Sequence, residues 1–214
     1  MSDSNNTVLL VDDHPLLRKG VRQLLELEDD ICVIGEASNG ADAVLLAAEL
    51  DPDLVLLDLS MKGMDGIETL TAMRNADVAS RIVVFTVSDD RNDVVSALKA
   101  GADGYLLKDT EPEELVASIH RACSGKLVLS EELAEVLALS FRGEKKTSGP
   151  DLETLTRREL QILKYVAEGL SNKLIGRKLE FAESTVKVHV KHLLKKLGLR
   201  SRVEAAIWMV EQKK

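Results

Sequence analysis

The sequence predicts a doubly wound α/β domain followed by a small all-α domain. Five short apolar runs alternate with helix-like segments in the first half of the chain, and a polar, Gly- and Pro-containing stretch at 141–150 follows. Charge divides the chain in the same place: residues 1–130 carry 11 Lys and Arg against 24 Asp and Glu, whereas residues 151–214 carry 14 against 8. We therefore expect domains at 5–125 and 151–214, joined by an interdomain helix and flexible linker at 126–150.

The first domain is expected to be a flavodoxin-like (βα)5 unit. Short continuous apolar runs are typical of parallel strands that are buried on both faces. We place the strands near 7–11, 31–35, 53–57, 81–86 and 103–107. We place the helices near 15–27, 40–49, 66–75, 91–100 and 111–124. Pro112 suits the first turn of the last helix, with Thr110 as its expected cap, and five βα units predict a parallel sheet with helices on both faces.

The second domain is expected to hold four short helices and no strand. A helix-like piece at 131–139 leads into the linker, and the four helices follow at 156–168, 171–179, 182–197 and 201–212. Thr156 with Glu159 three residues later forms a capping box, as the start of a helical domain would require. In the last helix, Val203, Ile207 and Val210 share one face with Ala206 beside them and Trp208 turned elsewhere; we expect part of this set to close the small core and part to form a dimer contact.

Polar residues stand at the points where four of the predicted strands end. Asp12 and Asp13, Asp58, Thr86 and Lys108 each follow an apolar run. Ligands of parallel sheets bind beyond the carboxyl ends of the strands, so these side chains should meet at one edge. Carboxylates that lie close together repel one another, so they stay ionised at low free-energy cost only if a cation neutralises them. A set of oxygen ligands without His or Cys suits Mg²⁺. The pattern indicates a phosphoryl-transfer site.

These residues lie in motifs that resemble the receiver domain of bacterial two-component response regulators. The motifs are VDDHP, LLDLSMKGMDG, VFTVSDD and GADGYLLKD, in this order and spacing, and the resemblance covers about residues 7–124. It implies that Asp58 accepts a phosphoryl group from a histidine kinase and that Asp12, Asp13, Asp58 and the backbone carbonyl of Ser60 bind Mg²⁺. It further implies that Lys108 and Thr86 contact phosphoryl oxygens and that Tyr105 turns inward when Thr86 moves.

One residue departs from the family pattern, and another separates this chain from a similar enzyme class. Lys62 stands where many members have Pro, which should loosen the turn and alter the lifetime of the phosphate without abolishing function. Haloacid-dehalogenase phosphatases need a second Asp two residues after the nucleophile, and position 60 is Ser. We therefore expect no enzymatic activity beyond slow autophosphorylation from phosphodonors and slow autodephosphorylation. His14, before Pro15, is expected to pack at the start of a helix.

The second domain resembles the LuxR-type helix-turn-helix domain of the NarL/FixJ family. Its motifs are LTRRELQIL, GLSNKLIGRKL and STVKVHVKHLLKKLGLRSRVEA. In the third helix, an apolar stripe is expected to be buried while basic residues face outward. The stripe is Val186, Val190, Leu193 and Leu197. The base-contact candidates are Lys187, Val188 and Lys191. The phosphate-contact candidates are Ser184, Thr185, Asn172, Lys173, Lys195 and Lys196.

The sequence as a whole predicts a phosphorylation-gated transcription regulator, and across its length it resembles the nitrate- and nitrite-responsive members of the family. Its expected partners are a sensor histidine kinase, double-stranded promoter DNA, a second copy on DNA, and RNA polymerase. No apolar stretch reaches the length of a membrane span and the first residues have no signal-peptide pattern, so a cytoplasmic protein is expected. Cys32 and Cys123 lack metal-site or redox spacing and are expected to be reduced.

Two alternatives remain, and the aromatic content of the chain argues against a third. The chain could regulate genes in response to another stimulus, or its receiver could work without phosphorylation. A ligand-gated LuxR regulator would need an aromatic-lined pocket, and before Phe141 the chain has only Phe85 and Tyr105 as aromatic residues.

Overall fold

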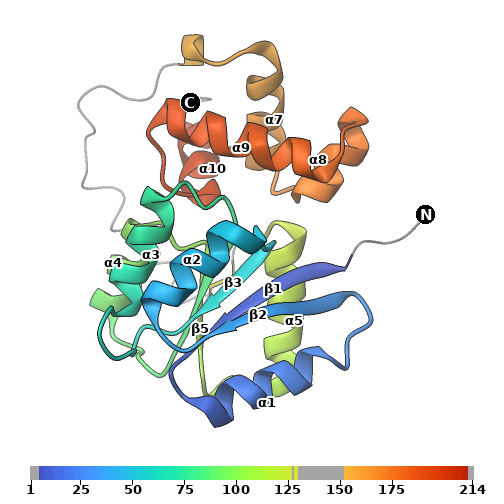
Figure 1. Ribbon diagram of the computed structural model, residues 1–214. Helices are drawn as coiled ribbons and strands as arrows, with labels where there is room; N and C mark the ends of the chain where they lie inside the picture. The colour runs from blue at the N-terminus through green and yellow to red at the C-terminus, as the bar shows by residue number, and fades with distance from the viewer. Residues whose placement is uncertain (1–4, 127, 130–151, 212–214) are drawn as a thin grey trace.

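The chain folds into an α/β domain and a helical domain that lie against each other (Figure 1). The structure, a computed structural model, describes residues 5–126, 128–129 and 152–211. The helix predicted at 131–139 and the linker predicted at 141–150 lie outside the described residues.

The α/β domain is built on five parallel strands. They are β1 (Asn6–Val11), β2 (Ile31–Ala37), β3 (Leu54–Leu57), β4 (Arg81–Thr86) and β5 (Gly104–Leu107). Their order across the sheet is β2-β1-β3-β4-β5, so the chain reverses direction across the sheet after β2. Each predicted strand is confirmed to within two residues, because a buried parallel strand leaves an apolar run with clear ends.

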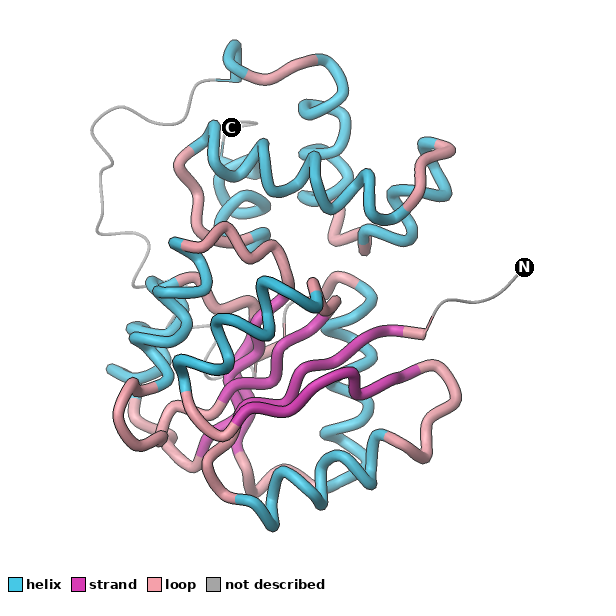
Figure 2. The backbone as a smooth tube through the Cα atoms, viewed as in Figure 1, coloured by secondary structure: helices cyan, strands magenta, loops and turns pink. Residues whose placement is uncertain are grey.

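Helices cover both faces of this sheet, as predicted (Figure 2). One face packs against α1 (Pro15–Leu25) and α5 (Pro112–Ser124). The other face packs against α2 (Gly40–Leu50), α3 (Gly66–Asn75) and α4 (Arg91–Ala100). Successive strand residues alternate between these two cores, as the pleat of a strand requires. Because all five strands are parallel, they end at one edge of the sheet and begin at the opposite edge.

The helical domain has its own hydrophobic core. It consists of a 3-10 turn, η1 (Leu152–Thr154), and the helices α7 (Arg157–Ala167), α8 (Asn172–Leu179), α9 (Glu183–Leu197) and α10 (Arg202–Glu211). The predicted capping box is confirmed: the Glu159 amide donates to Thr156 Oγ1 at 3.2 Å, and the Thr156 amide donates to a Glu159 carboxylate oxygen at 2.8 Å. The apolar stripe of α9 is also confirmed, since Val186, Val190, Leu193 and Leu197 are all buried.

Two local predictions are wrong. In α10 the core side consists of Ala205, Trp208 and Met209, whereas Val203 and Ile207 are only half-buried; the side chain of Val210 lies outside the described part of the chain. The large indole therefore fills the core instead of turning away from it. The cap of α5 is Glu111, not Thr110, and Glu111 makes no side-chain cap hydrogen bond; Pro112 already supplies the favourable φ angle of the first turn.

The two domains touch through backbone as well as through side chains. Gly125, which ends α5, and Gly169, which follows α7, both have a positive φ, 109° at Gly125 and 78° at Gly169. A Cβ atom on Gly125 would lie 2.0 Å from the carbonyl oxygen of Gly169, so only glycine permits this approach. Within the described parts of the chain, no helix has the length and apolar character needed to cross a bilayer.

Candidate functional site

Three carboxylates meet where β1 and β3 end. The Asp58 amide donates to the Val11 carbonyl at 2.9 Å, which holds the end of β3 beside the end of β1. Oxygens of Asp12, Asp13 and Asp58 lie within 4.8 Å of one another. Asp12 and Asp58 are buried and Asp13 is half-buried. The structure thus brings together the acidic residues that the strand-end pattern singled out.

Lys108, which follows β5, reaches into the same cluster. Its Nζ atom lies 2.8 Å from Asp12 Oδ2 and 2.8 Å from Asp58 Oδ2, and its side chain is largely buried. The Lys108 amide donates to the Thr86 carbonyl at 2.8 Å, so β4 fixes the position from which the lysine extends. One ammonium group therefore links β1, β3 and β5 at a single point.

The charges of this cluster suit a divalent cation. Three carboxylates face one ammonium group, and the remaining negative charge is concentrated on oxygen atoms, the ligands that Mg²⁺ prefers. Asp12, Asp13 and Asp58 are the side chains that could hold such an ion. His14 is the fourth member of the group, with Nδ1 2.9 Å from Asp13 Oδ1. The expectation that His14 packs at the helix start is wrong, because its side chain is 66% exposed.

The loop after Asp58 is held close to the start of α3. The Ser60 amide donates to Asp58 Oδ1 at 3.2 Å, and the Gly66 amide donates to the Leu59 carbonyl at 3.0 Å. A Cβ atom on Gly66 would lie 2.4 Å from the Asp58 carbonyl oxygen. The glycine in the MDG motif is therefore what allows α3 to approach the carboxylate cluster.

Thr86 and Tyr105 are linked through Ser88, a residue that the sequence did not single out. The Ser88 amide points to Thr86 Oγ1 at 3.4 Å, and the Tyr105 hydroxyl donates to the Ser88 carbonyl at 2.8 Å. Tyr105 is only 1% exposed, and burial raises the pKa of its hydroxyl to about 12. The Tyr105 side chain thus already points inward. A change at Thr86 can reach the β4–α4 loop through Ser88 without an inward turn of Tyr105.

The predicted base-contact residues of α9 face the α/β domain. Lys187, Val188 and Lys191 line a cavity of about 290 Å³ together with residues of α2 and of the loop after α3. The residues from the α/β domain are Ala47, Ala48, Asp51, Ala76, Asp77, Val78 and Ala79. Val188 is nevertheless 51% exposed, as expected for an apolar side chain outside the core of its own domain.

Two basic side chains on this surface form ion pairs with carboxylates of the α/β domain. Lys187 Nζ lies 3.0 Å from Asp53 Oδ1 and donates to the Asp51 carbonyl at 2.8 Å. Lys195 Nζ lies 3.1 Å from Asp77 Oδ2. Burial opposes the charge of Lys187, but the surrounding carboxylates outweigh it and raise the pKa of its ammonium group. Sequence reasoning missed these aspartates because their partners lie in another domain.

The other predicted DNA contacts have varied surroundings. Ser184 and Thr185 are exposed at the start of α9, and Lys173 is half-buried in α8. Lys196 pairs with Glu159 at 2.8 Å, and Asn172 accepts a hydrogen bond from Arg202. The last two side chains therefore have partners inside their own domain. Both cysteines are free thiols, as predicted: Cys32 is exposed and Cys123 is buried.

Two protein-family models match the chain, one for each domain. The response regulator receiver domain matches residues 8–120. The LuxR family of bacterial regulatory proteins matches residues 153–209. Together they cover both of the sites described above.

Similar proteins share this domain order over nearly the whole chain. The nitrate/nitrite response regulator protein NarL of Escherichia coli K12 is 57% identical over 207 residues, which are 97% of this chain and 96% of that protein. NarP of the same strain is 48% identical over 96% of this chain and 95% of its own. Among solved structures, the response regulator ChrA of a heme-sensing two-component system is 34% identical with a TM-score of 0.52, over 98% of each chain.

Proposed function

The chain belongs to the LuxR-type two-component response regulators, and we propose that Asp58 is its phosphoacceptor and that α9 is its DNA-recognition helix. A receiver joined to a LuxR-type domain controls transcription in response to phosphorylation. In this chain, a histidine kinase transfers a phosphoryl group to Asp58 with Mg²⁺ held by Asp12, Asp13, Asp58 and the Ser60 carbonyl. The bound ion would neutralise charge on the phosphoryl oxygens.

The observation that carries this proposal is the position of Lys187. A side chain that is suited to contact bases is paired with Asp53 of the α/β domain, and its neighbours Val188 and Lys191 line the same interdomain cavity. DNA cannot occupy this face of α9 while the domains are docked. Phosphorylation of Asp58 therefore acts by favouring separation of the domains, after which two copies bind paired half-sites on DNA.

Asp58→Asn tests the phosphoacceptor. The wild-type chain should take up phosphate from a small-molecule phosphodonor in the presence of Mg²⁺, and the amide variant should not, because an amide cannot form the mixed anhydride. Phosphate uptake is measured by intact-protein mass spectrometry. Asp65→Asn, which changes an exposed carboxylate at the start of α3, is the matched control. Full labelling of Asp58→Asn would show that the phosphoacceptor is another residue.

We further propose that the regulated genes serve nitrate and nitrite respiration and that the DNA-bound dimer contacts RNA polymerase. The similarity to NarL and NarP over almost the full chain supports the stimulus. A genome-wide binding profile with and without nitrate tests it: sites should be occupied upstream of nitrate- and nitrite-respiration genes, and only with nitrate. Nitrate-independent occupancy of other promoters would instead support the alternative that the regulator serves another stimulus.

A further inference from the structure

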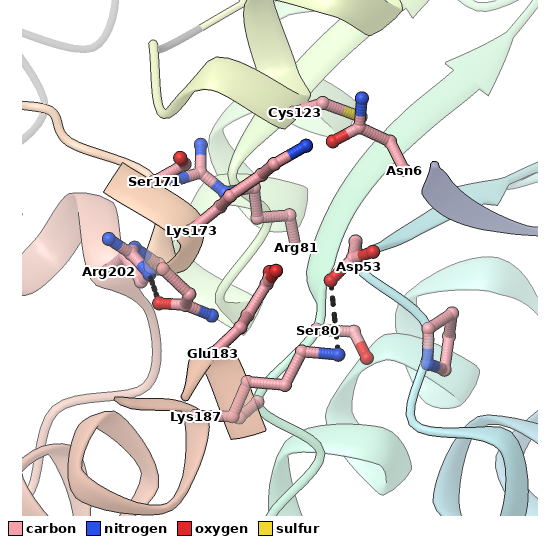
Figure 3. A pocket seen from close by; sticks show the side chains of 13 residues that line it. Asn6, Asp53, Ser80, Arg81, Cys123, Ser171, Lys173, Glu183, Lys187 and Arg202 are labelled. Carbon is pink, nitrogen blue, oxygen red and sulfur yellow. Dashed lines mark hydrogen bonds and ion pairs between the residues drawn. The ribbon is translucent and has the colours of Figure 1, made fainter. Parts of the chain in front are cut away.

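A second, smaller cavity lies at the domain junction, on the side of the sheet where strands begin. Its volume is about 20 Å³, enough for one water-sized group. Figure 3 shows its walls: Asn6, Asp53 and Arg81 come from the starts of β1, β3 and β4, and the helical domain supplies the facing wall. The residues of that facing wall are Ser171, Asn172, Lys173, Glu183, Lys187 and Arg202. The cavity exists only when the two domains are docked.

Arg81 presents an unused donor to this cavity. The residue is 8% exposed and its Nη1 atom donates to the Ala122 carbonyl at 2.5 Å. Its Nη2 atom is buried and has no hydrogen-bond partner among the described residues. Asp103 is close enough to attract Arg81, but one of its oxygens is taken by Arg74 at 2.7 Å and the other makes no hydrogen bond to any described residue. A buried charged donor without a partner is costly, so a missing acceptor is expected.

Arg202 brings a second buried guanidinium to the same cavity. It donates to the Asn172 side chain and, at 2.6 Å, to the Leu170 carbonyl, so its contacts are with neutral groups. Burial, and then repulsion from Arg81, lowers the pKa of Arg202 to about 9. The two guanidinium groups come from different domains, and docking forces them together.

Nearby carboxylates offset the charge of this pair only in part: Asp53 and Asp103 attract Arg81, and Asp103 attracts Arg202, but each carboxylate is shared with other donors. Asp53 accepts hydrogen bonds from the Thr7 amide and hydroxyl at 2.9 and 2.8 Å, and it pairs with Lys187 at 3.0 Å. Burial and the charge of Asp53 raise the pKa of Glu183, which favours its neutral form. Lys173 adds a further positive charge to the wall. The arginine side of the cavity therefore carries a net positive charge.

We propose that this cavity binds a small inorganic anion of about the size of chloride, held between Arg81 and Arg202 of the docked domains. Such an anion accepts the free hydrogen bond of Arg81 and offsets the repulsion between the two guanidinium groups. Because both domains form its site, the anion binds the docked state and not the separated one. It therefore stabilises docking by mass action, independently of phosphorylation.

Bromide tests the site directly. Crystals of the unphosphorylated full chain are grown in sodium bromide, and anomalous diffraction is collected at the bromine edge. The expected result is an anomalous peak in the cavity within hydrogen-bond distance of Arg81 Nη2. A cavity filled by ordered water, with no anomalous signal, would overturn the proposal.

A melting experiment tests the same site in solution. The wild-type melting temperature is compared in sodium chloride and in sodium gluconate at equal ionic strength, since gluconate is too large for the cavity. Chloride should raise it by about 3–6 °C, the shift expected for a tenfold excess of anion over its dissociation constant. Arg81→Met should lose this difference, and Arg91→Met, which changes an exposed arginine of α4, should keep it. A chloride effect that persists in Arg81→Met contradicts the proposal. If that variant does not fold, the bromide crystal decides alone.

Discussion

Lys108 holds two carboxylates with one ammonium group, and this contact defines the unphosphorylated state of the site. Its Nζ atom is equally close to Asp12 and Asp58. When Asp58 becomes an acyl phosphate, its carboxylate charge moves outward onto the phosphoryl oxygens. Lys108 is then expected to follow that charge, which changes how the end of β5 is held beside β4.

Glu183 should make docking of the domains depend on pH. Its carboxyl group lies at the start of α9 and faces Asp53, Lys187 and Lys173, and burial raises its pKa above the ordinary value of 4.5 in the docked state. A group with a raised pKa stabilises the docked state fully below its ordinary pKa, and this contribution is lost as pH rises through the raised value. Asp53, whose pKa is lowered despite its burial, acts in the opposite sense only at more acidic pH.

Glu183→Gln should therefore weaken DNA binding by the unphosphorylated chain at neutral pH and flatten its pH dependence. The amide keeps the neutral form that docking favours, so the docked state no longer loses stability as pH rises. Affinity for DNA is measured from about pH 5 to about pH 8. The same substitution in residues 151–214 alone is the control for any direct effect on DNA. Identical pH profiles of the variant and the wild-type chain would count against this role.

At the scale of single elements, the position of α3 depends on a glycine that packs against the backbone of Asp58. Gly66→Ala would place a Cβ atom 2.4 Å from the Asp58 carbonyl oxygen and 2.4 Å from Leu59 Cα. Both are backbone atoms, so the variant should lose about 1–3 kcal/mol of stability in urea unfolding. Gly20→Ala in α1 is the matched control, because nothing lies within 4 Å of its Cβ atom, and it should gain up to about 1 kcal/mol. Equal stability of the two variants would contradict this account of the loop.

If α9 is the DNA-recognition helix, as proposed, it should lose sequence discrimination when Lys191 is shortened. Lys191→Ala is expected to weaken specific DNA binding by about 1–3 kcal/mol, because it removes a donor to base edges in the major groove. The affinity of the phosphorylated chain is measured for target DNA and for random DNA. Lys164→Ala, on the exposed side of α7, is the control. Equal losses on both DNAs would make Lys191 a phosphate contact.

Helices and strands could be predicted where the residues that determine their ends are close together in the sequence. Strand ends and the capping box of α7 depend on neighbouring residues, so their positions could be read from the sequence. The orientation of α10 could not, because Val203, Ile207 and Trp208 offer two possible apolar faces and only packing against α7 and α9 selects one. Ser88 was missed for a similar reason: its link to Tyr105 uses a backbone carbonyl, which carries no sequence signal.

At the scale of the whole molecule, Asp58, the proposed phosphoacceptor, and the docked helical domain lie at opposite edges of one sheet. Asp58 directly follows β3, whereas Asp53, the partner of Lys187, directly precedes it. A four-residue strand spans roughly 13 Å, so phosphorylation cannot disturb the Lys187 pair by contact. The signal must therefore pass through the sheet or the helices packed on it. The sequence placed the residues of the carboxylate cluster, but it held no information about this docking.

Removing the α/β domain should strengthen DNA binding by the helical domain. Residues 151–214 contain a complete core and expose α9 on all sides not buried in that core. They should bind target DNA more tightly than the unphosphorylated full chain, and phosphorylation should reduce the difference. Affinities are compared by fluorescence anisotropy at one salt concentration, since phosphate contacts are salt-dependent. Binding by residues 151–214 that is no tighter than binding by the full chain would rule out occlusion by the α/β domain.

The pairing of Lys187 with Asp53 makes DNA an effector of this protein as well as its target. If α9 binds DNA as proposed, DNA and Asp53 compete for the ammonium group of Lys187, so bound DNA is expected to shift the domains apart, as phosphorylation is proposed to do. Linked equilibria are reciprocal. The factor by which phosphorylation raises the affinity for DNA is also the factor by which bound DNA shifts the phosphorylation equilibrium towards the phosphorylated form. A promoter can thus help to retain the signal that brought the regulator to it.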